Sequence, residues 1–164
     1  MQEKMTEQFT VAITGDAIIN RRISVSRDEG FLSLVRVIRE ADIGYTHLET
    51  LVHDYDGPEI YPAAEAGWTW MRSPHFVPEE LKWAGFDIVS HASNHSLDYS
   101  YGGLYSTWKA LDEAGLPYAG IYDNADLHLP SQLVRNNAGD DVRSTAGTIS
   151  DSHPYRFGRI GLRN

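Results

Sequence analysis

The sequence predicts an α/β fold in which helices cover a parallel β-sheet. Short apolar segments alternate with segments of helical period along residues 1–120, and strands that are joined through helices pair in parallel. Polar side chains follow three of the apolar segments at the point where each ends. The ends of parallel strands meet at one edge of a sheet, and this edge is where such folds bind ligands.

Four segments are predicted to be strands because they are short, apolar and bounded by turn residues. They are residues 9–16, 43–49, 86–93 and 116–121. Residues 50–68 contain two prolines and two glycines, so we expect a long surface loop there.

Residues 28–42 are predicted to form a helix. Phe31, Leu34, Val35 and Ile38 are spaced so that they share one face of a helix. We therefore expect this face to pack against the sheet.

Two further helices are predicted at residues 77–85 and 101–115. Pro78 suits the first turn of one helix, and Gly85 and Gly115 suit the residue just past each helix end. The longer helix has one apolar face, formed by Leu104, Trp108 and Leu111.

The composition changes near residue 121. Residues 121–164 contain five Arg and five Asp but no Lys, Glu or Trp, whereas the first 120 residues hold all three Lys and all four Trp. No helical or strand period stands out in this tail. We therefore predict two parts: a domain over residues 1–120, which the resemblance described below implies is partial, and a divergent, loop-rich tail over residues 121–164.

The overall charge limits the function classes. The formal net charge is −9 and the pI is about 5.1, which argues against nucleic acid or anionic membranes as partners, because both require clustered Lys and Arg.

There is no cysteine and no run of 18 apolar residues, so we expect no disulfide, no thiolate chemistry and no membrane segment. The N-terminus shows no apolar signal segment, so a cytoplasmic location is expected. An acidic protein that acts on an anionic substrate usually needs a metal to offset the repulsion.

Three polar clusters follow predicted strands and carry the candidate chemistry. Asp16 and Glu49 offer anionic oxygens, Asn94 offers a neutral one, and His95 is a further ligand or an acid/base near neutral pH. Each of these residues could instead have an ordinary structural role, as a turn residue or as a solvated side chain. Mixed oxygen and nitrogen ligands suit a divalent metal ion of the Mn, Fe or Zn type. His47 and His91 lie near the same edge and are candidate supplementary ligands.

Two other side chains have open roles. Asp98 either orients His95 or caps the helix that begins near Tyr101, and we favour the cap. Arg21 follows Asp16 by five residues and either binds an anionic group or is a surface charge.

The motifs "TGDAIINRR", "THLET" and the block "MRSPHFVPEELKWAGFDIVSHASNHSLDYSYGGLYSTWKALDEAGLPYAG" together resemble the CapA family of bacterial capsule-synthesis or poly-γ-glutamate-synthesis proteins. This family is similar to the calcineurin-like metallophosphatases, so the resemblance implies a layered metallophosphatase-like α/β sandwich. It covers roughly residues 9–120.

The resemblance also implies roles for individual residues. Asp16, Glu49 and Asn94 would hold the metal, His95 would be the catalytic acid, and Arg21 would lie near an anionic small-molecule or polymer substrate. Such a centre activates water and stabilises negative charge on a phosphoryl or carboxyl group.

The chain departs from the family pattern in three ways. His47 stands where the family has Asn, and Ser93 replaces the first Asn of the Asn-Asn-His motif. The later histidine motifs that complete the family's metal site have no match here. The sequence therefore resembles the N-terminal half of a member, with an incomplete metal site.

Three functions remain open from the sequence: a metal-dependent hydrolase-type or polymer-synthesis enzyme, a non-catalytic remnant or binding module on the same scaffold, and an ordinary sugar- or nucleotide-binding α/β domain. Metal content after purification separates the last from the first two.

Overall fold

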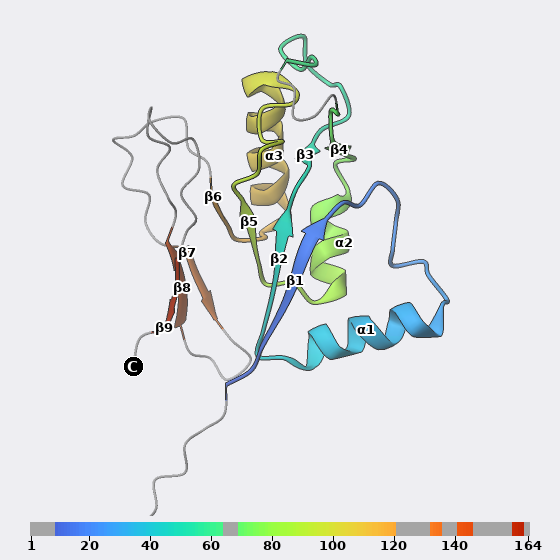
Figure 1. Ribbon diagram of the computed structural model, residues 1–164, viewed down its shortest axis with the longest axis vertical. Coiled ribbons are helices and arrows are strands. Elements are labelled where there is room, and N and C mark those ends of the chain that lie inside the picture. Colours follow the sequence, from blue (N-terminus) through green and yellow to red (C-terminus); the bar gives the residue numbers. More distant parts are fainter. Residues whose placement is uncertain (1–8, 64–68, 121–131, 136–140, 146–158, 163–164) are drawn as a thin grey trace, which may run out of the picture.

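A four-stranded parallel sheet forms the centre of the chain (Figure 1). The computed structural model describes residues 9–63, 69–120, 132–135, 141–145 and 159–162. The strand order is β1-β2-β5-β6, and every neighbouring pair is parallel. The strands are β1 (Val11–Ala17), β2 (Ile43–Leu48), β5 (Ile88–His91) and β6 (Tyr118–Gly120). The predicted parallel α/β fold is therefore confirmed, and all four predicted strands are present.

Three helices alternate with these strands, as predicted. They are α1 (Glu29–Glu40), α2 (Val77–Ala84) and α3 (Ser100–Ala114). The Asp28 carboxylate accepts a hydrogen bond from the Phe31 N–H at 2.7 Å and so caps the start of α1. Gly85 and Gly115 end α2 and α3 in the left-handed conformation, with φ of 100° and 60°, which costs glycine less than other residues.

The main core lies on one face of the sheet, where all three helices contribute side chains. Leu48 of β2 and Val89 of β5 have no exposed surface and pack in one cluster with Ile38, Leu81 and Leu111 from the three helices. Side chains alternate between the faces of a strand. The residues next to Leu48 and Val89 in their strands therefore point to the opposite face, which is the face that carries the candidate site.

The start of the predicted loop 50–68 is part of the core instead. Leu51–Val52 form β3, which pairs in parallel with β4 (Arg72–Ser73). Both residues of β3 have no exposed surface. The Val52 N–H donates to the Thr107 hydroxyl of α3 at 2.8 Å, so contact with α3 brings this segment inside.

The predicted apolar face of α1 is only partly buried. Val35 and Ile38 are buried, but Leu34 is 53% exposed. Leu34 lines a cavity of about 410 Å³ together with residues of β1, among them Ala17. Helical spacing groups these residues on one side, whereas packing against the rest of the chain decides which of them are covered.

The described part of the tail contains three short strands that the sequence did not predict. They are β7 (Gln132–Arg135), β8 (Asp141–Thr145) and β9 (Arg159–Leu162), and they form an antiparallel sheet in this order. Most of residues 121–164 lie outside the described residues, so the division of the chain at residue 120 stays a prediction. None of the helices in the described part of the chain has the length and apolar character that crossing a membrane requires.

Candidate metal centre

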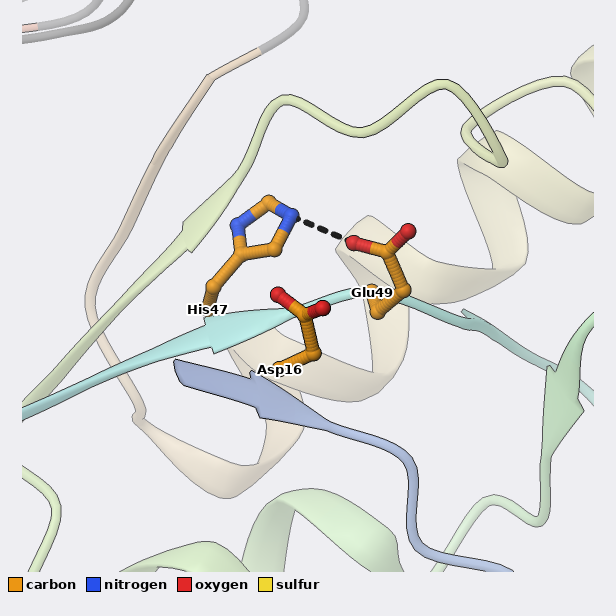
Figure 2. A group of neighbouring side chains, drawn as sticks. All are labelled: Asp16, His47 and Glu49. Carbon is orange, nitrogen blue, oxygen red and sulfur yellow. Dashed lines mark ion pairs between the residues drawn. The ribbon is translucent and has the colours of Figure 1, made fainter. Parts of the chain in front are cut away.

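Asp16, His47 and Glu49 come together at the C-terminal ends of β1 and β2 (Figure 2). One ligand atom from each side chain can be chosen so that all three atoms lie within 4.8 Å of one another. His47 and Glu49 are largely buried, and Asp16 is exposed. The group therefore opens toward solvent on the side of Asp16.

An irregularity in β1 places Asp16 beside His47. Ile13 pairs with Tyr45, but Asp16 pairs with His47, so β1 takes three steps where β2 takes two. This extra residue is a β-bulge, a feature that re-aims side chains near functional sites. In a regular ladder Asp16 would pair with Leu48 and its carboxylate would lie farther from the imidazole.

Strand alternation supplies the other two side chains. His47 and Glu49 are two residues apart, at the end of β2 and just beyond it, so they point to the same side of the sheet. Leu48 between them is fully buried in the helical core. This core contact anchors the strand end and leaves the two polar side chains facing the open side.

His47 has a partner at each ring nitrogen. Its Nε2 lies 2.7 Å from Oε2 of Glu49, and its Nδ1 lies 2.6 Å from Oγ of Ser90. The ring orientation is therefore set by two contacts from two different strand ends.

His95 lies at the border of this group. Its Nε2 is 3.9 Å from Oε1 of Glu49, and its Nδ1 is 2.7 Å from Oδ2 of Asp98. Asp98 has no exposed surface, and its Oδ2 also accepts a hydrogen bond from the Met71 N–H at 2.6 Å. Asp98 thus holds the ring of His95 with Nε2 toward Glu49.

The favoured role of Asp98 as a helix cap is wrong. The N-cap of α3 is Tyr99, which makes no side-chain capping bond. Asp98 lies one residue before the cap, where its side chain turns inward to His95 and Met71. Sequence spacing could not distinguish a helix cap from a partner of His95, because an acidic residue just before the helix can serve as either.

A tight polar turn after β5 carries Asn94 and His95. The Ser93 hydroxyl accepts a hydrogen bond from the His95 N–H at 2.9 Å, and the Ser96 hydroxyl accepts one from the Ser93 N–H at 3.0 Å. His95 is buried and Asn94 is exposed in this turn. The role of Asn94 as a metal ligand stays a prediction. His47 is the third member of the donor group, and its position two residues before Glu49 is the signal that marks it in the sequence.

Arg21 is exposed on the segment that follows β1, and its contact with an anionic substrate stays a prediction. The neighbouring Arg22 pairs with Glu80 at 3.0 Å and lies over the ring of Phe76 at 4.5 Å. Burial alone would raise the pKa of Glu80, but hydrogen bonds from Ser24, from the Ile23 N–H and from Arg22 outweigh it and lower this pKa below 4.5. Glu80 therefore anchors the segment after β1 as a carboxylate.

His91 does not belong to the donor group. It has no exposed surface, and its Nδ1 lies 3.3 Å from the Leu48 carbonyl oxygen. Burial lowers the pKa of His91 to about 4, so the ring is neutral near neutral pH. Its proposed role as a supplementary ligand finds no support in this position.

The model of the bacterial capsule synthesis protein family PGA_cap matches residues 10–156 of the chain. The chain belongs to the PGA_cap family. The predicted resemblance to capsule-synthesis proteins is thereby confirmed. Two relatives from Sinorhizobium fredii (strain NBRC 101917 / NGR234), the uncharacterized proteins y4sH and y4uA, are each 34% identical to it over 135 residues. The match covers 82% of this chain but 29% of each relative, so the PGA_cap chain spans less than a third of their length.

The donor atoms of this PGA_cap chain fit a divalent metal ion. Two carboxylates and one imidazole are ligand types that Mn, Fe and Zn accept. With bonds of about 2.0–2.2 Å, two ligands on opposite sides of one metal lie about 4.4 Å apart. Ligands that are neighbours around one metal lie closer, at about 3.0–3.5 Å, so the three side chains, whose chosen atoms lie within 4.8 Å of one another, would rotate toward a common ion.

Proposed function

We propose that this chain carries the N-terminal part of a metal-dependent hydrolytic site in a PGA_cap protein. The substrate is an anionic small molecule or polymer, attacked at a phosphoryl or carboxyl group. The observation that carries the proposal is the convergence of Asp16, His47 and Glu49, with His95 Nε2 3.9 Å from Glu49. When bound, a divalent metal supplies Lewis-acid stabilisation of negative charge and activates water.

Asp16, His47 and Glu49 hold the metal in this proposal, and Asn94 offers a further neutral oxygen from the turn after β5. Two neighbouring carboxylates repel each other, and the formal net charge of the chain is −9. A bound cation offsets both this repulsion and that between the protein and an anionic substrate. A metal ion held by the donor group thus allows an acidic protein to bind an anionic substrate.

His95 acts as the acid that delivers a proton to the leaving group. Asp98 accepts a hydrogen bond from Nδ1, so the second nitrogen faces the donor group and is free to exchange a proton with the substrate. Arg21 is assigned to the anionic part of the substrate.

The test uses the full chain freed of metal by chelation. We expect calorimetric titration with Mn²⁺ and with Zn²⁺ to detect one site, and Asp16→Ala to weaken binding by more than about tenfold, or 1.4 kcal/mol. Asp112→Ala, which removes an exposed carboxylate from α3, is the matched control and should bind as the wild type does. Absence of binding, or equal binding by Asp16→Ala, would contradict the metal site.

Hydrolysis of a generic phosphoester is the second readout. Because three donor side chains come together in the described part of the chain and a catalytic site also needs a position for water or substrate, we expect weak metal binding and slow or undetectable turnover. Metal binding that depends on Asp16, without turnover even in a longer relative, would favour the non-catalytic binding module. Turnover that His95→Gln abolishes while metal binding persists would support the hydrolytic role.

A further inference from the structure

Two hydroxyl groups form a hydrogen-bonded chain to the ring nitrogen of His47 that does not face Glu49. The Tyr45 hydroxyl donates to Oγ of Ser90 at 2.8 Å. Ser90 Oγ lies 2.6 Å from Nδ1 of His47. We call these two hydroxyl-bearing residues the Tyr45–Ser90 relay.

The sheet itself builds this relay. Tyr45 and His47 are two residues apart on β2 and share one face. Ser90 of β5 is the direct partner of His47 in the register of the two strands. Neighbouring strands lie about 4.8 Å apart, so a serine hydroxyl can reach the ring. All three side chains stand on paired strands and not on a loop, which makes their relative positions rigid.

We propose that Ser90, supported by Tyr45, is a positioning residue that holds the ring of His47 and accepts a hydrogen bond from its Nδ1–H when Nε2 binds metal. This inference rests on the proposed metal site. An imidazole binds metal through a nitrogen lone pair, so Nε2 must be free of a proton and Nδ1 must carry it. Nδ1–H then donates to Ser90, whose oxygen accepts this bond and the one from Tyr45 with its two lone pairs.

The same relay accommodates the ring when its Nε2 donates to Glu49. In that state the proton is on Nε2, which lies 2.7 Å from the Glu49 carboxylate, and the Ser90 hydroxyl turns to donate to Nδ1. Passing between the two states releases the Nε2 proton to water and takes up a proton from water at Nδ1, so the ring stays neutral. Within the relay, the hydroxyl hydrogen of Ser90 turns away from Nδ1, while Tyr45 keeps donating to the same oxygen.

The test titrates the metal-free full chain with Zn²⁺ by calorimetry. Removing a group that orients a metal-binding histidine typically weakens metal affinity by about 10–100-fold, and we expect a loss in this range for Ser90→Ala. Ser90→Thr keeps the hydroxyl and should restore most of the affinity. Tyr45→Phe keeps the ring but removes the donor, so its loss should be smaller than that of Ser90→Ala.

Two spectroscopic readouts separate positioning from a general structural effect. Nitrogen NMR of the Zn²⁺-bound wild type should show Nδ1 of His47 protonated, and the Co²⁺ absorption spectrum should change in Ser90→Ala and return in Ser90→Thr. Ser33→Ala removes an exposed hydroxyl from α1 and should change neither. Circular dichroism verifies that each variant folds. If Ser90→Ala does not fold, the Zn²⁺ affinity and the two spectra of Tyr45→Phe test the positioning role instead.

The outcomes distinguish this inference from the proposed function. If Zn²⁺ binds in a manner that depends on Asp16 but Ser90→Ala and Tyr45→Phe leave the affinity and both spectra unchanged, the relay has no positioning role and the metal site stands. A loss of affinity that Ser90→Thr does not restore also overturns the relay. If the wild type does not bind Zn²⁺, or Asp16→Ala binds equally well, the proposed metal site is wrong and the inference fails with it.

Discussion

The Nδ1 atom of His95 lies 2.7 Å from Oδ2 of Asp98. This contact fixes the orientation of a histidine whose other nitrogen lies 3.9 Å from Glu49. Because Asp98 has no exposed surface, the pair is shielded from water and forms a structural unit as well as part of the candidate site.

Asp98→Asn should destabilise the chain by roughly 1–3 kcal/mol, the usual cost of disturbing a buried hydrogen-bonded group. One carboxylate oxygen, Oδ2, accepts from both His95 and the Met71 N–H. An amide oxygen in that place loses the negative charge that strengthens both bonds, and its NH2 group falls at the buried Oδ1 position, which has no partner among the described residues. Urea denaturation measures the change. Asp112→Asn, at an exposed position on α3, should stay within about 0.5 kcal/mol of the wild type. Equal stability of the two variants would show that the Asp98 contacts contribute nothing.

Metal should stabilise the folded chain, and Glu49→Gln should reduce this effect. A ligand that binds only the folded state at 100 times its dissociation constant adds about 2.7 kcal/mol to the free energy of unfolding. Glu49→Gln replaces an anionic donor of the candidate group, so the same Zn²⁺ concentration should add less. Denaturation with and without Zn²⁺ measures the difference. Glu40→Gln, exposed at the end of α1, should respond like the wild type; a full response by Glu49→Gln would contradict the site.

Glu80→Gln should lower stability near neutral pH by roughly 1–3 kcal/mol, because the carboxylate accepts hydrogen bonds from Arg22, Ser24 and Ile23. The pKa of Glu80 in the folded state lies below its ordinary value of 4.5. Its stabilisation is therefore fully present above pH 4.5 and is lost as the pH falls through the lower, folded pKa.

Urea denaturation at a series of pH values tests this dependence on Glu80. The difference between wild type and Glu80→Gln should be constant at higher pH and shrink below pH 4.5. Glu79→Gln, at the exposed neighbouring position, should show no such trend. A difference that grows as the pH falls would mean that the sign assigned to Glu80 is wrong.

Gly44→Ala should destabilise the chain by about 1–3 kcal/mol, as overpacking in a tight site does. A Cβ added at Gly44 would overlap the carbonyl oxygen of Gly85 and lie 3.1 Å from Cα of Phe86. These are backbone atoms and cannot rotate away. Gly15→Ala is the matched control, since its Cβ would meet nothing within 4 Å. Thermal unfolding of both variants measures the difference in stability. Comparable stability would contradict the close approach of the backbone at Gly44 to the backbone at Gly85 and Phe86.

Much of the fold follows from local signals in the sequence. The alternation of apolar strands with helices predicts parallel pairing, and the glycines at 85 and 115 predict two helix ends that the structure confirms. Local signals fail where an element depends on a distant contact. Leu51 and Val52 follow Thr50 into a segment rich in turn residues, yet contact with α3 makes them part of the core.

The candidate site divides in the same way. The sequence by itself determined that Asp16, Glu49 and His95 lie at one edge of the sheet, because strand polarity brings the ends of parallel strands together. The sequence offered both His47 and His91 as supplementary ligands, and only the tertiary structure decided between them, because the bulge in β1 sets Asp16 opposite His47.

Tertiary structure likewise decided that the side chain of Asp98 points inward, since its hydrogen-bond partner Met71 is 27 residues away in the chain. The physical reason is that residue type and period specify which face and edge a side chain occupies. Its hydrogen-bond partner depends on register, bulges and packing between segments that are distant in sequence.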